Sequence, residues 1–195
     1  TGASNTAVGD SALTANTTAA NNTAVGFSAL TANTTGSSNT AVGRKALTTN
    51  TTGESNTAVG LNSQLLVVTG DNNTSLGLEA LRNNTASNNT AVGKDALRVN
   101  TTGSRNTAVG LSSGAATTTG GNNASFGAYS LFTNITASYN AAFGDSALYH
   151  STAADNTGLG YGACYRTTSG ANNTGVGSSA LYTNTTGINN TAVGY

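Results

Sequence analysis

One pentapeptide, N-[TA]-[ASG]-[VLF]-G, recurs along the whole chain and limits what the chain can fold into. Its asparagine occurs twelve times, at intervals of 17 residues except for two intervals of 16, after Asn73 and Asn140. This spacing is too short for most helical repeats, which need about 30 residues or more to hold a helix pair. It fits one coil of a β-solenoid. We therefore predict an all-β chain folded as a parallel β-solenoid, or β-roll, of about twelve coils that begin at Asn5, Asn22, Asn39, Asn56, Asn73, Asn89, Asn106, Asn123, Asn140, Asn156, Asn173 and Asn190.

The alternation within the pentapeptide predicts which side chains are buried, because successive residues of a strand point to opposite faces. The fourth position is bulky and apolar in every copy, and we predict that it points into the core. The second position shares this face and is threonine in ten of the twelve copies. The predicted strand part of the core is Val8, Val25, Val42, Val59, Leu76, Val92, Val109, Phe126, Phe143, Leu159, Val176 and Val193.

The third position lies on the opposite face and is never larger than serine. A column that faces solvent has no physical reason to exclude long polar side chains in all twelve copies. We therefore predict that another copy of the chain packs against it. The predicted interchain interface is Ala7, Ala24, Ala41, Ala58, Ser75, Ala91, Ala108, Ser125, Ala142 and Ala192.

The fifth position is glycine in every copy, which predicts a corner that needs a positive φ or a close approach of two backbones. The chain is expected to turn at Gly9, Gly26, Gly43, Gly60, Gly77, Gly93, Gly110, Gly127, Gly144, Gly160, Gly177 and Gly194. Four residues beyond most of these corners stands a leucine, which we interpret as the second core residue of its coil. These leucines are Leu13, Leu30, Leu47, Leu81, Leu97, Leu131, Leu148 and Leu181.

A second asparagine follows most of these leucines and predicts another turn, stabilised by asparagine side chains stacked from coil to coil. Three coils, which begin at Asn56, Asn106 and Asn156, depart from this half of the pattern. In them the leucine is replaced by Gln64, Gly114 and Cys164. Their spacing of 50 residues indicates either a periodic feature of the outer surface or a record of how the gene was duplicated.

The composition excludes several classes of function. Lys and Arg number 7 against 7 Asp and Glu, and only 7% of the residues are charged. The chain therefore lacks the excess of positive charge that nucleic-acid binding requires, and no nucleic-acid partner is expected. No apolar run approaches the roughly 20 residues of a membrane span, and membrane insertion is not expected. The single histidine, His150, is expected at a surface or turn position, and the single cysteine, Cys164, as a small buried hydrophobic residue. We predict no catalytic site, no metal site and no cofactor.

The repeat N-T-A-V-G, with its glycine corner and Ala-rich second leg, resembles the head repeats of trimeric autotransporter adhesins. It is still more similar to the N-T-A-V-G…A-L…N-T-T-G arrays of tail-fibre-like phage proteins and bacterial surface fibre proteins, and the similarity covers all 195 residues. It implies a β-roll or β-solenoid, commonly trimeric, that serves as an extracellular fibre. The unit here is about three residues longer than the adhesin head repeat.

Three functions are compatible with the sequence. The leading expectation is a structural and adhesive fibre segment, extracellular, on a cell surface or a virion, whose partner is itself, as a homo-oligomer or an end-to-end filament. A glycan or protein receptor on a host surface would be a second partner. Residues 1–195 are expected to form a single repeat domain without caps, as part of a longer fibre or filament. The alternatives are an ice-binding solenoid that uses its threonine array and a carbohydrate-binding, tailspike-like solenoid that uses Tyr129, Phe132, Tyr139, Tyr149, Tyr161 and Tyr165.

Overall fold

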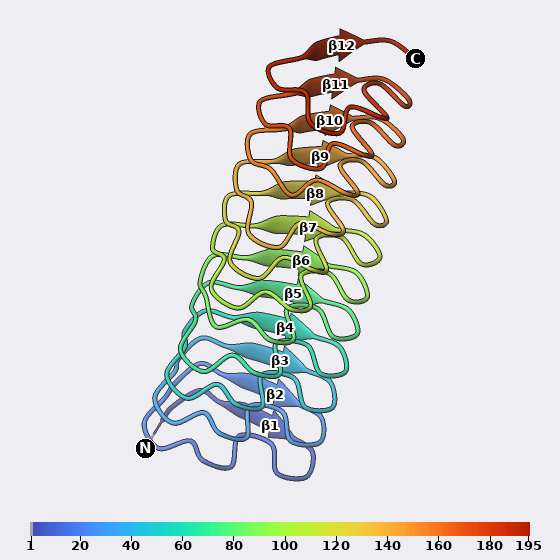
Figure 1. The fold of residues 1–195 in the computed structure, drawn as a ribbon. Helices are drawn as coiled ribbons and strands as arrows, with labels where there is room; N and C mark the ends of the chain where they lie inside the picture. The colour runs from blue at the N-terminus through green and yellow to red at the C-terminus, as the bar shows by residue number, and fades with distance from the viewer. Residues whose placement is uncertain (1) are drawn as a thin grey trace.

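The computed structural model describes residues 2–195, which form a rod of stacked coils (Figure 1). Twelve short strands lie in chain order in one parallel sheet, and each coil contributes one strand. The predicted all-β parallel solenoid is confirmed, and Thr1 lies outside the described residues. The strands are β1 Thr6–Val8, β2 Thr23–Val25, β3 Thr40–Val42, β4 Thr57–Val59, β5 Thr74–Leu76, β6 Thr90–Val92, β7 Thr107–Val109, β8 Ala124–Phe126, β9 Ala141–Phe143, β10 Thr157–Leu159, β11 Thr174–Val176 and β12 Thr191–Val193.

Equivalent positions of the repeat pair directly in the sheet. Ala7 stands opposite Ala24, and Val8 stands opposite Val25. The pairing of equivalent positions is preserved across a 16-residue coil, since Thr74 pairs with Thr90. The missing residue is therefore absorbed between strands, where a turn tolerates it.

The glycine corner is required by the close stacking of coils. All twelve of these glycines have φ values between +124° and +139°, a region that residues with a Cβ rarely adopt. At Gly60 a Cβ atom would also lie 2.5 Å from the carbonyl oxygen of Gly77 in the next coil. A side chain at this corner would push the two coils apart, which explains why only glycine occurs there.

The second leg of each coil consists of tight turns. In the coil of β3, the Ala46 N–H donates to the Gly43 carbonyl over 3.3 Å, and the Asn50 N–H donates to the Leu47 carbonyl over 3.2 Å. Leu47 lies between these turns with a φ of +50°, which is uncommon for a residue with a Cβ. The Leu47 N–H donates to the backbone carbonyl of Ser63 in the next coil. Stacking between coils and burial of the leucine thus hold a conformation that the isolated chain would avoid.

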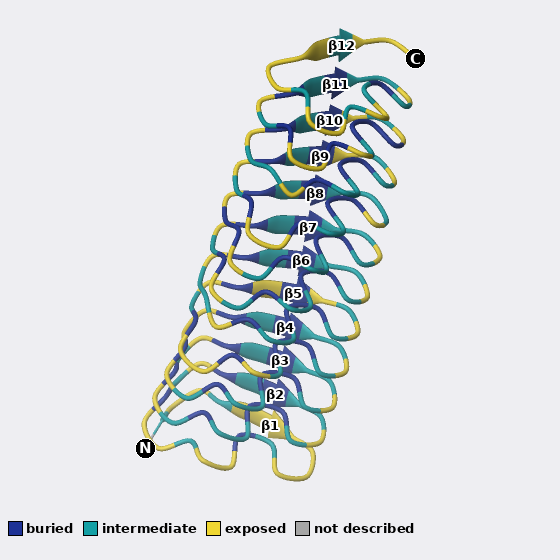
Figure 2. Cartoon of the chain, in the orientation of Figure 1, coloured by how far each residue is buried: buried dark blue, intermediate teal, exposed yellow. Residues whose placement is uncertain are grey.

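The orientation of the strands is the reverse of the one predicted from the sequence. The third position points inward, and in the interior strands it is buried, as at Ala41 and Ala58. The fourth position points outward: Leu76 is 49% exposed and Leu159 is 48% exposed. Figure 2 shows this pattern repeated along the sheet, with exposed residues more frequent in the terminal strands.

The inversion has a steric cause, since the second leg passes close beneath the strand. A Cβ at Gly158 would lie 3.3 Å from Leu148 Cγ, and one at Gly175 would lie 2.7 Å from Cys164 Sγ. Leucines of the second leg therefore fill the interior and leave room for only a small residue opposite. The predicted strand core is wrong, because its members lie on the outer face: Val8, Val25, Val42, Val59, Leu76, Val92, Val109, Phe126, Phe143, Leu159, Val176 and Val193.

The predicted interchain interface is wrong for the same reason. Its members face the core of their own chain, and those in β2 to β9 are buried. Those in the terminal strands β1 and β12 are covered on one side only, and Ala7 is exposed while Ala192 is half-buried. The column consists of Ala7, Ala24, Ala41, Ala58, Ser75, Ala91, Ala108, Ser125, Ala142 and Ala192.

Two asparagine ladders connect the coils inside the rod. In the pentapeptide, the side-chain Oδ1 of Asn39 accepts a hydrogen bond from the Asn56 backbone N–H over 2.9 Å. Its Nδ2 donates to the Gly53 carbonyl over 2.8 Å. In the predicted second turn, the side chain of Asn50 donates to both the Gly53 carbonyl and the side chain of Asn33, each over 2.9 Å. Buried asparagine is stable only when hydrogen-bonded, and each of these side chains bonds both within its coil and to a neighbour.

The leucines of the second leg lie in the core, and the departing coils divide it. The apolar core forms three clusters, which contain Leu47, Leu97 and Leu148 respectively. Between them, Gln64 donates to the Thr57 carbonyl, and Gly114 leaves a core position without a side chain. The third departing residue, Cys164, remains part of an apolar cluster.

Candidate binding surfaces

The outer strip of the sheet runs along all twelve strands. It consists of the outward second and fourth positions of the twelve strands, so threonine and valine columns run side by side along the rod. Large apolar residues extend this strip around the glycine corner, where they are 38–63% exposed: Phe27, Leu61, Leu78, Leu111 and Tyr161. Exposed apolar residues gathered along one face are a feature of surfaces that contact another molecule.

A column of stacked aromatic rings runs along the second leg of the carboxy-terminal coils. The ring centroids of Phe132 and Tyr149 are 5.1 Å apart, those of Tyr149 and Tyr165 are 5.1 Å apart, and those of Tyr165 and Tyr182 are 4.9 Å apart. These distances match the spacing of adjacent strands, about 4.8 Å, so the column carries one ring per coil. Tyr129 lies edge-on against Phe132.

The aromatic column ends at a hollow of about 690 Å³ beside Phe132. In the coil below, the equivalent position is Ala115, and in the coil below that it is Arg98. Ala115 and Ala116 line the hollow at the level of the missing side chain, and Phe132 and Ile135 line it from the coil above. The departing coil that begins at Asn106 therefore interrupts the outer column and opens a notch in the surface.

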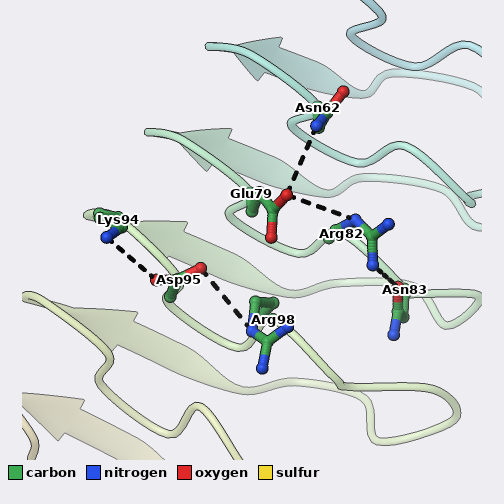
Figure 3. A network of polar contacts seen from close by, with 7 residues as sticks. All are labelled: Asn62, Glu79, Arg82, Asn83, Lys94, Asp95 and Arg98. Atoms are coloured by element: carbon green, nitrogen blue, oxygen red, sulfur yellow. Dashed lines mark hydrogen bonds and ion pairs between the residues drawn. The ribbon is translucent and has the colours of Figure 1, made fainter.

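Charged residues also line the hollow, namely Glu79, Lys94, Asp95 and Arg98. Figure 3 shows their ion pairs and the neighbouring polar contacts. Asp95 lies between two cations, with Lys94 Nζ at 3.8 Å from its Oδ2 and Arg98 Nε at 3.7 Å from its Oδ1. Glu79 accepts a hydrogen bond from Asn62 and lies 3.7 Å from Arg82 Nε. Such ion pairs between partly exposed groups are weak and rearrange at little cost.

The single cysteine and histidine lie in structural positions. Cys164 is buried, and desolvation raises the pKa of its thiol, so the thiol is protonated and a poor nucleophile at neutral pH. His150 packs edge-on against Tyr149 and Tyr165. Desolvation in the stack and the neighbouring phenols of Tyr149 and Tyr182 also raise the pKa of Tyr165.

Sequence reasoning identified the aromatic region but not its geometry. Phe132, Tyr149 and Tyr165 come together as predicted, whereas Tyr139 and Tyr161 lie outside the column and are each 63% exposed. Tyr182 was missed, although it stands at the same repeat position as Tyr149 and Tyr165. Alignment by repeat position would have shown both the column and its gap at Ala115.

No protein-family model, curated protein or solved structure matches the chain. Residues 2–195 hold no group of three or more His, Cys, Asp or Glu side chains that could bind a metal ion. The same residues include no helix long and apolar enough to cross a membrane.

Proposed function

We propose that the chain is a structural and adhesive segment of an extracellular fibre, exposed on a cell surface or a virion. The observation that carries this proposal is the unbroken in-register stack of twelve strands. At about 4.8 Å per strand, the stack makes a rod roughly 5 nm long. A quasi-one-dimensional array of this kind gains length by adding coils and requires no new contacts to do so.

Copies of the chain associate through the outer strip in this proposal. The strip repeats along the rod, so two parallel copies bury equivalent residues at every coil, as symmetric assemblies require. Its valine, leucine and phenylalanine side chains supply the apolar area, and few charges interrupt it. The outer strip takes the place of the alanine column as the proposed contact surface, because the alanines of the interior strands are buried inside the chain.

The test is the mass of the purified protein by light scattering coupled to size exclusion. We expect an oligomer, and we expect the double variant Val42→Lys, Val92→Lys to be monomeric, because each lysine would bury an unpaired charge in the contact. Thr52→Lys, at an exposed turn, is the matched control and should leave the mass unchanged. A monomeric wild type at tens of micromolar, or an oligomer indifferent to the valine substitutions, would contradict the proposal.

Ice binding is a second candidate, favoured by one observation. The threonine column was expected to be buried with the valines, but it points outward and repeats in register over β1 to β7. A regular array of hydroxyl and methyl groups of this kind can order water. Thermal hysteresis measured on wild type and on Thr57→Lys distinguishes the two functions: hysteresis in a monomer, lost in the variant, supports ice binding in place of lateral association.

A further inference from the structure

We propose that the notch beside Phe132 binds a neutral pyranose ring of a surface glycan. This proposal names the ligand of the adhesive role and rests on that role. It uses residues separate from the outer strip, apart from Leu78 at the rim of the hollow. The association test and the binding test can therefore fail independently.

The notch has the height of one missing ring. Backbone hydrogen bonds align the three coils, since the Leu97 N–H donates to the Ser113 carbonyl and the Gly114 N–H donates to the Ser130 carbonyl. Arg98 and Phe132 are therefore two layers apart, about 9–10 Å at the strand spacing. A ring in van der Waals contact with both needs about 7–8 Å, twice the contact distance of about 3.5–4.0 Å. A ligand ring at the level of Ala115 would extend the aromatic column by one position.

The lining of the notch favours a sugar over a flat aromatic ligand. Phe132, Ile135, Ala115 and Ala116 supply an apolar wall on which the C–H face of a pyranose stacks. The lining also holds the carboxylates of Glu79 and Asp95 and the hydroxyls of Ser112 and Thr118. Their oxygens can accept hydrogen bonds from sugar hydroxyls in addition to the partners that Glu79, Asp95 and Thr118 have within the chain. A purely aromatic ligand would offer these oxygens no hydrogen-bond donor.

The charges of the notch favour a neutral sugar over a phosphate or an acidic sugar. The charged side chains that line the hollow are two carboxylates, Glu79 and Asp95, and two cations, Lys94 and Arg98. Their charges sum to zero, so no net charge attracts an anion. Within residues 2–195, Arg98 pairs with Asp95 through Nε, and its two Nη groups are available to donate to sugar oxygens. The volume of about 690 Å³ lies within the range of small-ligand sites and exceeds the needs of one ring.

The test is saturation-transfer NMR with neutral oligosaccharides, namely cello-, malto-, manno-, galacto- and chito-oligosaccharides, at millimolar concentration. We expect at least one of them to bind the wild type, with signal transfer to the C–H groups of one sugar face. Ala115→Tyr fills the notch with the residue that the column carries in the coils above, so it should fold normally and lower the affinity about tenfold or more. Phe132→Ala removes the stacking face and should do the same.

Tyr182→Ala is the matched control, because it removes a ring from the far end of the same column. We expect it to retain the wild-type affinity. Absence of binding by every oligosaccharide in the panel would overturn the proposal, and so would binding that Ala115→Tyr leaves unchanged. Preference for phenylalanine amide or for a sialylated oligosaccharide over the neutral sugars would also overturn the assignment of ligand class.

Discussion

The inner and outer faces of one strand, β4 (Thr57–Val59), differ in what they contain and in what they allow. Ala58 faces inward and belongs to an apolar cluster with Leu47 and Val67. Val59 faces outward and is half-buried. Across the twelve repeats the inner column varies only among Ala, Ser and Gly, whereas the outer column varies among Val, Leu and Phe. The column with the narrower range of sizes is therefore the packed one.

This comparison predicts that losing an inner hydrogen bond lowers the free energy of unfolding more than a change on the outer face does. Replacing Asn39 with leucine keeps the volume similar but leaves the Asn56 N–H without its partner. It also removes one of the two hydrogen bonds to the Gly53 carbonyl, which still accepts from Asn50. The unpaired N–H costs about 1–3 kcal/mol and the second lost hydrogen bond about 0.5–1.5 kcal/mol, so we expect a loss of about 1.5–4.5 kcal/mol in the free energy of unfolding. Urea unfolding followed by circular dichroism measures it. Thr40→Ala, on the outer face of the next position, should change it by less than about 1 kcal/mol.

The leucine column gives an effect of comparable size, through lost packing rather than lost hydrogen bonds. Leu47 is fully buried, and Leu47→Ala should cost about 2–5 kcal/mol through lost contacts and a cavity. Leu66 is the matched control, because its side chain is 42% exposed. Leu66→Ala should lower the free energy of unfolding by less than about 1 kcal/mol. Equal losses in the two variants would show that the second leg does not bury its leucines as described.

The smallest effect concerns the pH dependence of stability at Cys164. Burial raises the pKa of this thiol above its ordinary value of 9.0, so in the folded state it stays protonated at a pH where the unfolded chain has begun to ionise. The unfolded state then binds fewer protons, and stability falls as the pH rises above about 9. Cys164→Ala should lack this part of the alkaline loss. Identical stability curves from pH 8 to 11 in both proteins would contradict the assignment.

The sequence was sufficient to predict the architecture because the repeat contains it. A fixed period and an obligatory glycine corner predict parallel stacking in register, and the pairing of Val8 with Val25 follows directly. The choice of the inner face could not be made by hydrophobicity alone. Bulky residues are usually buried, but here the leucine of the second leg occupies the interior and excludes a second large residue. The size restriction of the third column was visible in the sequence, but it was interpreted as contact with another copy, whereas the structure buries this column in the chain itself.

The candidate notch was less predictable, because it depends on an absence at one repeat position. The departing coil at Asn106 was recognised, but its outer consequence follows from Ala115, a residue with no chemical signal of its own. Only the stacking of that coil between Arg98 and Phe132 turns a small side chain into a hollow. The coil beginning at Asn156 shows the contrast, since Tyr165 keeps the column filled there.

The orientation of the strand is tested most directly by exchanging sizes across β4. Ala58→Val and Val59→Ala are compared by urea unfolding under identical conditions. We predict that Ala58→Val loses about 1–3 kcal/mol, because the inner column has no room for two more methyl groups. Val59→Ala should lose less than about 1 kcal/mol, since the outer side chain is only half-buried. The opposite order, with Val59→Ala the more damaging and Ala58→Val neutral or stabilising, would contradict the structure's placement of the core.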